Sequence, residues 1–200
     1  MHDTINRLTS AFERFPGIGP RQARRFVFHL LSTPTRDRAN LSELIGSLDK
    51  DVQQCPSCYR FDTFTGNVCR YCSDRSRDDT LLMIIEKDQD IVAIERANYY
   101  RGRYFVLGGV LTLSGKGIIR QRELLQTIKN RLESGLKEII LALSATSEGE
   151  YTADRLREIL APYRSSVRIT ILGRGLATGS ELEYADAKTL SGAFANRKES

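Results

Sequence analysis

The four cysteines are the residues whose type and spacing define a chemistry most directly. They form two pairs, Cys55 with Cys58 and Cys69 with Cys72, and ten residues separate the pairs. Each pair can present two thiolates from a tight turn, and the four sulfurs form the tetrahedral set that a structural zinc ion takes. Four protein ligands leave no open position for catalysis. The prediction is one structural Zn²⁺ per chain, stabilising a segment too small to fold alone.

Two other uses of the cysteines remain as alternatives. A disulfide framework is disfavoured because the N-terminal residues contain no apolar signal segment and cytosolic thiols stay reduced. A redox-active C-x-x-C pair is disfavoured because two such pairs within 18 residues suit one shared metal better. The residues between the pairs, 59–68, are long enough for a short hairpin that would bring the four sulfurs together.

A glycine-containing turn at residues 15–23 lies between two stretches whose apolar residues recur at helical spacing. A turn of the form glycine, apolar residue, glycine between two helices is typical of a helix-hairpin-helix. In such a turn Gly17 and Gly19 let the backbone approach a phosphate closely. The helix that follows would offer its free N–H groups and its positive dipole end to that anion. The pattern therefore predicts contact with a phosphate backbone.

Three arginines, Arg21, Arg24 and Arg25, open this second helix. Cations at a helix N-terminus oppose the helix dipole, which makes sense where an external anion compensates them. Binding of this kind recognises the nucleic-acid backbone and not its sequence. The alternative is a glycine-rich packing corner with scattered arginines. In either case the neighbouring phenylalanines are expected to lie at least partly in the core: Phe12, Phe15, Phe26 and Phe28.

The formal net charge of +5 is unevenly distributed along the 200 residues. Residues 1–40 carry seven arginines against three acidic residues, and residues 96–131 carry eight basic residues against one glutamate. Acidic residues predominate between these two segments. Two basic segments separated by acidic ones suggest two surfaces that face a polyanion, and the alternative is a solvated face without a ligand.

From residue 81 onward, predicted strands and helices alternate. Strands are predicted at 81–86, 104–107, 138–143 and 167–172, and helices at 90–97, 124–132 and 153–160. This order predicts an α/β domain with a mostly parallel central sheet. Thr152 is the expected N-cap of the last helix.

Ligands of such sheets bind at the carboxyl ends of the strands. Glu86 follows one predicted strand there, and Glu148 and Glu150 lie in a loop after another. These carboxylates could bind Mg²⁺, but metal-dependent phosphodiester chemistry needs several clustered carboxylates. The positions directly after the second strand are the neutral Ser144 and Thr146, so the sequence predicts a weak metal site.

In this order the features resemble the bacterial recombination-mediator protein RecR family, along essentially the whole chain. The resemblance rests on the four cysteines and on these stretches: Phe15–Arg21, Phe28–Leu31, Arg77–Asp78, Tyr100–Gly102, Val106–Gly109, Glu148–Glu150, Thr152–Ala153, Arg174–Gly175 and Leu182–Asp186. The chain departs from the family pattern in three loops, at residues 113–117, 144–146 and 177–179.

The resemblance implies an α/β protein in four parts. These are a helix-hairpin-helix region at 1–50, a C4 zinc finger at 51–79, a Toprim domain at 80–175 and a C-terminal segment of Walker-B-like character at 176–200. It also implies a ring-like homotetramer that clamps single- and double-stranded DNA at single-strand gaps. Such a protein is a non-enzymatic mediator of DNA repair that assists recombinase loading together with RecO and RecF.

The resemblance also assigns roles to particular residues. The family's DNA contacts carry over to Arg21 and Arg25. Its Toprim acids carry over to Glu86, Glu148 and Glu150, which in the family serve partner binding more than catalysis. A competing function is a Mg²⁺-dependent Toprim nuclease or phosphodiesterase that uses these three acids. Another is a zinc-ribbon interaction module without a nucleic-acid role.

The sequence also predicts where the protein works. Its longest apolar runs, residues 81–85 and 139–143, are far shorter than the ~20 residues of a membrane span. With no signal segment either, we expect a soluble, cytoplasmic protein that does not enter a membrane. The sequence leaves open the preferred DNA structure, the oligomer size and whether tight DNA binding needs a partner.

Overall fold

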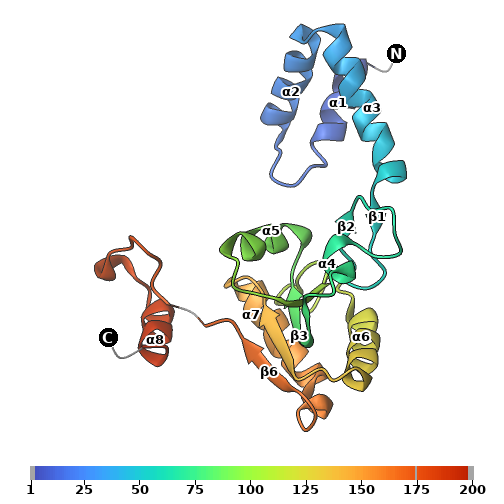
Figure 1. The fold of residues 1–200 in the computed structure, drawn as a ribbon. Helices are drawn as coiled ribbons and strands as arrows, with labels where there is room; N and C mark the ends of the chain where they lie inside the picture. The colour runs from blue at the N-terminus through green and yellow to red at the C-terminus, as the bar shows by residue number, and fades with distance from the viewer. Residues whose placement is uncertain (1–2, 174, 198–200) are drawn as a thin grey trace. The chain divides into compact units, whose positions relative to one another are not determined.

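The computed structural model describes residues 3–173 and 175–197. The chain divides into two compact units, Met1–Val52 and Gln53–Ser200 (Figure 1). The first unit contains three helices, α1 (Thr4–Phe12), α2 (Pro20–Ser32) and α3 (Thr35–Asp51). The turn that joins α1 to α2 is the predicted hairpin, and α2 begins with a proline, whose fixed φ angle suits the first helical position.

The interior of the first unit is small. Ala23 and Val27, both on α2, are its buried hydrophobic residues within the described part of the chain. The helix α3 is an element that the sequence analysis did not predict, although its apolar residues recur at helical spacing. These residues are between 42% and 61% exposed, so α3 presents an apolar face to solvent: Leu41, Leu44, Ile45 and Leu48.

The second unit begins with a small module that carries the cysteines. The strands β1 (Gln53–Gln54) and β2 (Phe61–Asp62) pair antiparallel, and the short helix α4 (Arg70–Ser73) follows them. We call residues 53–73 the cysteine module. The β1–β2 hairpin encloses the first cysteine pair, whereas the predicted hairpin lay between the two pairs, where the described residues 59–68 contain only the single strand β2.

A four-stranded parallel sheet forms the core of the second unit. Its strands β3 (Asp78–Ile85), β4 (Gly102–Val106), β5 (Glu138–Ala142) and β6 (Arg168–Ile171) are arranged in the order β4-β3-β5-β6. The connecting helices are α5 (Asp88–Ala97), α6 (Gln121–Glu133) and α7 (Ser147–Ile159), followed by the 3₁₀ turn η1 (Ala161–Tyr163). The predicted α/β fold with a parallel sheet is confirmed.

Alternate residues of the strands enter two apolar layers, because successive strand side chains point to opposite faces. Leu82, Ile84 and Phe105 pack in the larger layer with residues of α6 and α7. Met83 and Tyr104 pack in the smaller layer with Ile91 of α5. Helices therefore cover the sheet on both faces, as parallel sheets require.

The prediction that Thr152 caps the last helix is wrong. The helix α7 begins at Ser147, and the Thr146 hydroxyl is the cap, accepting a hydrogen bond from the Gly149 amide at 3.1 Å. Thr152 is buried inside α7, where its hydroxyl donates to the Glu148 carbonyl at 2.6 Å and accepts from the Leu111 amide at 2.8 Å. The first turn of α7 is polar, so the apolar spacing alone placed the start of the helix too late.

After β6 the chain forms the 3₁₀ turn η2 (Leu182–Tyr184) and the helix α8 (Ala187–Ala195). Asp186 caps α8 by accepting from the amides of Lys188 and Thr189. Across the described ranges, no helix combines the length and the apolar character that crossing a membrane requires.

Candidate functional site

The structure brings the four predicted cysteine ligands together. The sulfurs of Cys55, Cys58, Cys69 and Cys72 all lie within 4.8 Å of one another. The Cys58 and Cys69 sulfurs are 3.5 Å apart, and the Cys69 amide donates to the Cys55 sulfur at 3.4 Å. Three of the cysteines are buried and Cys72 is half-buried. Within the described ranges, no other group of three or more His, Cys, Asp or Glu side chains lies close enough together to share a metal ion.

Each cysteine pair forms a tight knuckle held by its own backbone. In the first, the Tyr59 amide donates to the Cys55 carbonyl at 2.8 Å, and Tyr59 itself adopts a left-handed conformation with φ of 64°. In the second, the amides of Cys72 and Ser73 both donate to the Cys69 carbonyl. These turns point the two sulfurs of each pair toward the other pair.

The donor set fits a soft divalent metal such as zinc. Tetrahedral coordination with Zn–S bonds of about 2.3 Å would separate the sulfurs by about 3.8 Å, close to the spacing observed. Cysteine sulfurs are soft donors, and a metal ion binds them as thiolates. The cluster could therefore bind one metal ion with no ligand position left over.

The predicted DNA-binding arginines share one exposed region of α2. Arg21, Arg24 and Arg25 are all exposed, and with Phe28 and His29 they line a shallow hollow of about 680 Å³. The first turn of α2 contains no acidic residue. In the described part of the chain no ion pair links these arginines to a carboxylate. Their charge therefore faces solvent at the N-terminal half of the helix.

The two glycines of the hairpin differ in what the backbone requires of them. Gly17 has φ of +76°, a conformation that other residues rarely adopt, so the turn needs glycine there. Gly19 has φ of −85° at the N-cap of α2, and an added Cβ there would meet nothing within 4 Å. A small residue at Gly19 leaves room for another molecule next to the helix N-terminus.

The four phenylalanines near the hairpin were expected to lie at least partly in the core, and two of them are instead more than half exposed. Phe12 and Phe26 are partly buried and meet edge to face, with ring centroids 5.7 Å apart. Phe15 and Phe28, in contrast, are 58% and 53% exposed. The first unit is too thin to enclose them, because only two hydrophobic residues of its described part are buried.

The three predicted acidic residues at the end of the sheet do not converge on one point. Glu86 accepts a hydrogen bond from the Ser144 hydroxyl at 2.7 Å, and Ser144 in turn lies 3.2 Å from the Thr146 hydroxyl. Glu150 pairs instead with Lys188 of α8 at 2.5 Å. Together with Glu148, these acids are not among the metal-competent clusters of the described residues. A carboxylate cluster for Mg²⁺ is therefore not assembled here.

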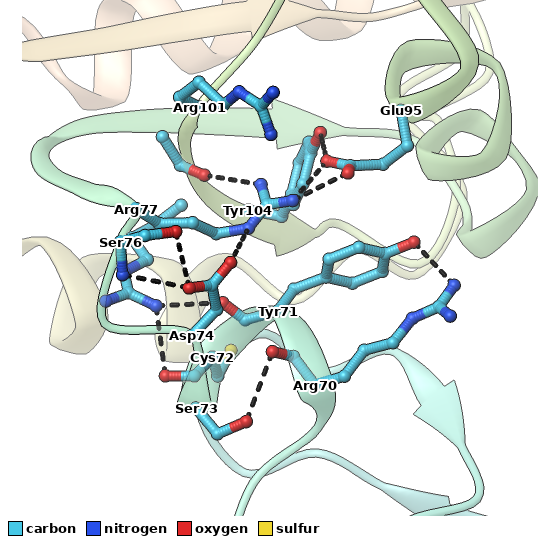
Figure 2. A network of polar contacts seen from close by, with 12 residues as sticks. Arg70, Tyr71, Cys72, Ser73, Asp74, Ser76, Arg77, Glu95, Arg101 and Tyr104 are labelled. Atoms are coloured by element: carbon cyan, nitrogen blue, oxygen red, sulfur yellow. Dashed lines mark hydrogen bonds and ion pairs between the residues drawn. The ribbon is translucent and has the colours of Figure 1, made fainter. Parts of the chain in front are cut away.

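A second polar site, which the sequence analysis missed, joins the cysteine module to the sheet (Figure 2). At its centre Arg77 donates to Glu95 of α5 at 2.7 Å, and the Tyr104 hydroxyl donates to the same carboxylate. Burial first, and then the hydrogen bond to Glu95, raises the pKa of Tyr104, so its hydroxyl remains a proton donor. The Arg77 guanidinium also lies 4.8 Å from the ring centre of Tyr71, in α4.

Arg103 forms the other half of this site. Its Nε donates to Asp79 at 2.7 Å, and its Nη1 donates to the backbone carbonyls of Tyr71 at 2.8 Å and Cys72 at 3.0 Å. Arg103 is only 7% exposed although its side chain is charged. A charged residue inside an otherwise apolar run was the available signal, since a buried charge requires a partner.

The second basic segment, residues 96–131, is therefore not one solvent-facing surface. Arg103 and Arg131 both pair with Asp79, and Arg120 donates to the Val106 carbonyl at 3.1 Å. The exposed basic residues of the segment lie on different elements: Arg96, Arg101, Lys116, Arg122 and Lys129.

These features define an α/β protein with a helix-hairpin-helix unit, a four-cysteine module and a parallel sheet. The family model described as "RecR, helix-hairpin-helix" matches residues 5–48, "Toprim domain" matches residues 80–172, and "RecR, C-terminal" matches residues 175–198.

Full-length relatives agree with these matches. The recombination protein RecR of Moorella thermoacetica is 40% identical over 201 residues, covering 98% of this chain and 97% of the relative. Those of Bifidobacterium longum subsp. infantis and Cutibacterium acnes are 39% and 37% identical, covering 98% and 96% of this chain and 96% and 94% of the relatives. The chain belongs to the recombination protein RecR family.

Proposed function

We propose that this chain is a non-enzymatic, DNA-binding recombination mediator that grips the sugar–phosphate backbone through α2. The observation that carries the proposal is the exposed group of Arg21, Arg24 and Arg25, which pair with no carboxylate of the described residues, at the start of a helix entered through Gly17 and Gly19. Phosphates on single- or double-stranded DNA would balance both these charges and the helix dipole. Membership of a family of recombination proteins supports a role in recombination repair.

The finer assignments extend the family resemblance to this chain. We propose that it acts at single-strand gaps, together with RecO and RecF, to assist recombinase loading. Glu86, Glu148 and Glu150 are the proposed partner-binding residues. They are half-buried and lie at the end of the sheet, and an acidic edge of this kind suits a partner with a basic surface.

A homotetramer is the proposed assembly. The first unit supports self-association because α1, α2 and α3 together line an apolar groove of about 550 Å³. Among its lining residues are Leu8, Phe15 and Ile45, and Ile45 alone is 61% exposed. We expect Ile45→Glu to lower the mass measured by light scattering, and an unchanged mass would count against this groove as a subunit contact.

The metal in the cysteine cluster is proposed to be one structural Zn²⁺ per chain. Metal analysis of the purified protein should give one zinc per chain, and Cys58→Ser should abolish both zinc binding and folding of the cysteine module. A protein that contains no metal yet folds normally would refute the assignment.

A Mg²⁺-dependent Toprim nuclease is the alternative function. It is disfavoured because the Glu86 and Glu150 carboxylates are bound by different partners rather than clustered, as a metal-dependent phosphodiesterase requires. Incubation with Mg²⁺ and nicked, gapped or supercoiled DNA tests it. Cleavage that disappears in Glu86→Ala would overturn the proposed non-enzymatic role.

A DNA-binding titration at several salt concentrations tests the main proposal. Binding should weaken as salt rises, and Arg21→Ala and Arg25→Ala should each weaken it several-fold and reduce the log–log salt slope by about 1. Arg155→Ala, which removes an exposed arginine of α7, is the matched control and should bind like the unaltered protein. Binding that ignores salt, or that is absent even with partners, would favour an interaction module without a nucleic-acid role.

A further inference from the structure

The edge strand of the sheet is covered, although no further strand within the described ranges pairs with it. The strand β4 lies at one end of the order β4-β3-β5-β6, yet all five of its residues are buried. An open edge strand presents a row of unpaired N–H and C=O groups to which another chain can pair. Something other than a fifth strand must therefore satisfy and cover β4.

Both knuckles of the cysteine module contribute to this cover, together with the Arg77 side chain, which donates to the Gly102 carbonyl, and the Tyr100 hydroxyl, which donates to the Arg103 carbonyl. From the first knuckle, the carbonyl of Cys58 accepts a hydrogen bond from the Val106 amide of β4 at 2.8 Å. From the second knuckle, the carbonyls of Tyr71 and Cys72 accept from the Arg103 side chain of β4. Two of these three carbonyls belong to the residues whose sulfurs form the cluster.

The contact surface around these hydrogen bonds is aromatic and charged. The Tyr71 ring meets the Tyr104 ring of β4 edge to face, with centroids 5.8 Å apart. The guanidinium groups of Arg60 and Arg77 each lie 4.8 Å from the centre of the Tyr71 ring. Figure 2 shows this seam, with Tyr71 and Cys72 on one side and Arg77, Glu95 and Tyr104 on the other.

Metal binding fixes the positions of the carbonyls that β4 uses. A metal ion that gathers four thiolates holds both knuckles closed, whereas four unbridged thiolates repel one another. We propose that the metal-loaded cysteine module is the metal-dependent part of the cover of the β4 edge, and that Arg103 is the positioning residue through which metal loading and the sheet are coupled.

The coupling reaches the acidic end of the sheet. Immediately after β4, the Leu107 amide donates to the Ile85 carbonyl at 2.8 Å and the Gly108 amide donates to the Glu86 carbonyl at 2.9 Å. Displacement of β4 would therefore displace the backbone of Glu86 as well. Coupling is reciprocal: if the metal stabilises the edge, contact with the edge strengthens metal binding by the same factor.

Hydrogen exchange of the full-length, metal-loaded protein tests the first half of the proposal without any substitution. Removal of zinc by a chelator under reducing conditions should lower the protection of amides in residues 102–106, including Val106, by about tenfold or more. The interior strand β5 should keep its protection. Unchanged exchange at 102–106 after zinc loss, or equal loss of protection in all four strands, would overturn it.

Zinc competition against a chromophoric chelator tests the second half. Arg103→Gln should weaken zinc binding by about tenfold, because it removes the donor to the Tyr71 and Cys72 carbonyls of the second knuckle without changing a cysteine. The matched control is Arg122→Gln, an exposed arginine of α6, which should bind zinc like the unaltered protein. If Arg103→Gln binds zinc as tightly as this control, the coupling through Arg103 is absent.

Discussion

The two basic segments of the chain use their arginines in opposite ways. In residues 1–40, Arg21 and Arg24 are exposed on one region of a helix and pair with no carboxylate of the described residues. In residues 96–131, Arg103 and Arg131 turn inward to Asp79, and Arg103 also donates to two backbone carbonyls. The exposed arginines of α2 leave their charge available to another molecule, whereas Arg103 and Arg131 use theirs in joining two parts of one unit.

The difference shows that the net charge of a segment does not identify a binding surface. What matters is the element on which each arginine lies. Arg21 lies in the first turn of an amphipathic helix, where its side chain is free to remain in water. Arg103 lies between Gly102 and Tyr104 in a buried strand, where an unpaired guanidinium would be costly. Burial therefore gives Arg103 a structural role.

The largest expected effect of a single change falls on Arg77, the buried arginine that shares the polar site of Figure 2 with Arg103. Glu95→Gln removes the carboxylate that pairs with Arg77, whose side chain is only 4% exposed. Leaving a buried guanidinium without its main partner should lower the free energy of unfolding by about 3 kcal/mol. Urea denaturation measures this change, and DNA affinity of the folded variant should stay the same.

The chain provides a matched control for this experiment. Glu158→Gln breaks the pair with Arg155, in which both side chains are more than half exposed, and it should change stability by no more than about 0.5 kcal/mol. If Glu95→Gln were as stable as Glu158→Gln, the network would not hold the unit together.

A second prediction compares arginine-to-lysine substitutions in the two segments, which keep the positive charge but replace the planar guanidinium with a compact ammonium group. Arg103→Lys retains a cation but loses the fork that reaches Asp79 and two carbonyls at once, so it should cost about 1–3 kcal/mol in stability. Arg21→Lys should leave stability unchanged and keep most of the DNA affinity, because a point charge still neutralises a phosphate. Thermal or urea unfolding and a DNA titration on both variants measure these effects. The reverse pattern, with DNA binding lost in Arg21→Lys alone, would indicate a bidentate contact on α2.

The sequence predicted the elements whose signals are local. Two C-x-x-C pairs specify a knuckle each, and alternating apolar runs specify strands and helices, so the cysteine cluster and the parallel sheet are confirmed. The helix α3 was missed although Leu41, Leu44 and Leu48 have helical spacing. Its apolar residues stay exposed, so they mark a surface rather than the interior of this unit.

What the sequence could not predict is pairing across long separations. Arg77 lies 18 residues from Glu95, and Arg103 lies 31 residues from Cys72, and only the parallel sheet brings each pair together. The acids at the end of the sheet show the same limit. The expected strand ends placed Glu150 near Glu86 at one edge of the sheet, but in the structure Glu150 pairs with Lys188 of α8.

The smallest expected effect concerns pH and again distinguishes the two segments. The hydrogen bond from Arg103 lowers the pKa of the Asp79 carboxyl below its ordinary value. A depressed folded-state pKa means that this contribution to stability is present above the unfolded-state value, near 4, and is lost as the pH falls through the folded-state value. Because Asp79 is 59% exposed, solvent screens the pair and the loss should be well under 1 kcal/mol.

The measurement is urea unfolding of the unaltered protein and of Asp79→Asn between about pH 2 and pH 6. The two stability curves should differ above the unfolded-state pKa of aspartate and converge at the acidic end, because the protonated aspartic acid and the asparagine that replaces it are both neutral there. Arg21→Gln should leave the acid dependence as it is, since no carboxylate of the described residues pairs with Arg21. Curves for Asp79→Asn that stay parallel to those of the unaltered protein would show that the Arg103 pair contributes nothing to stability in solution.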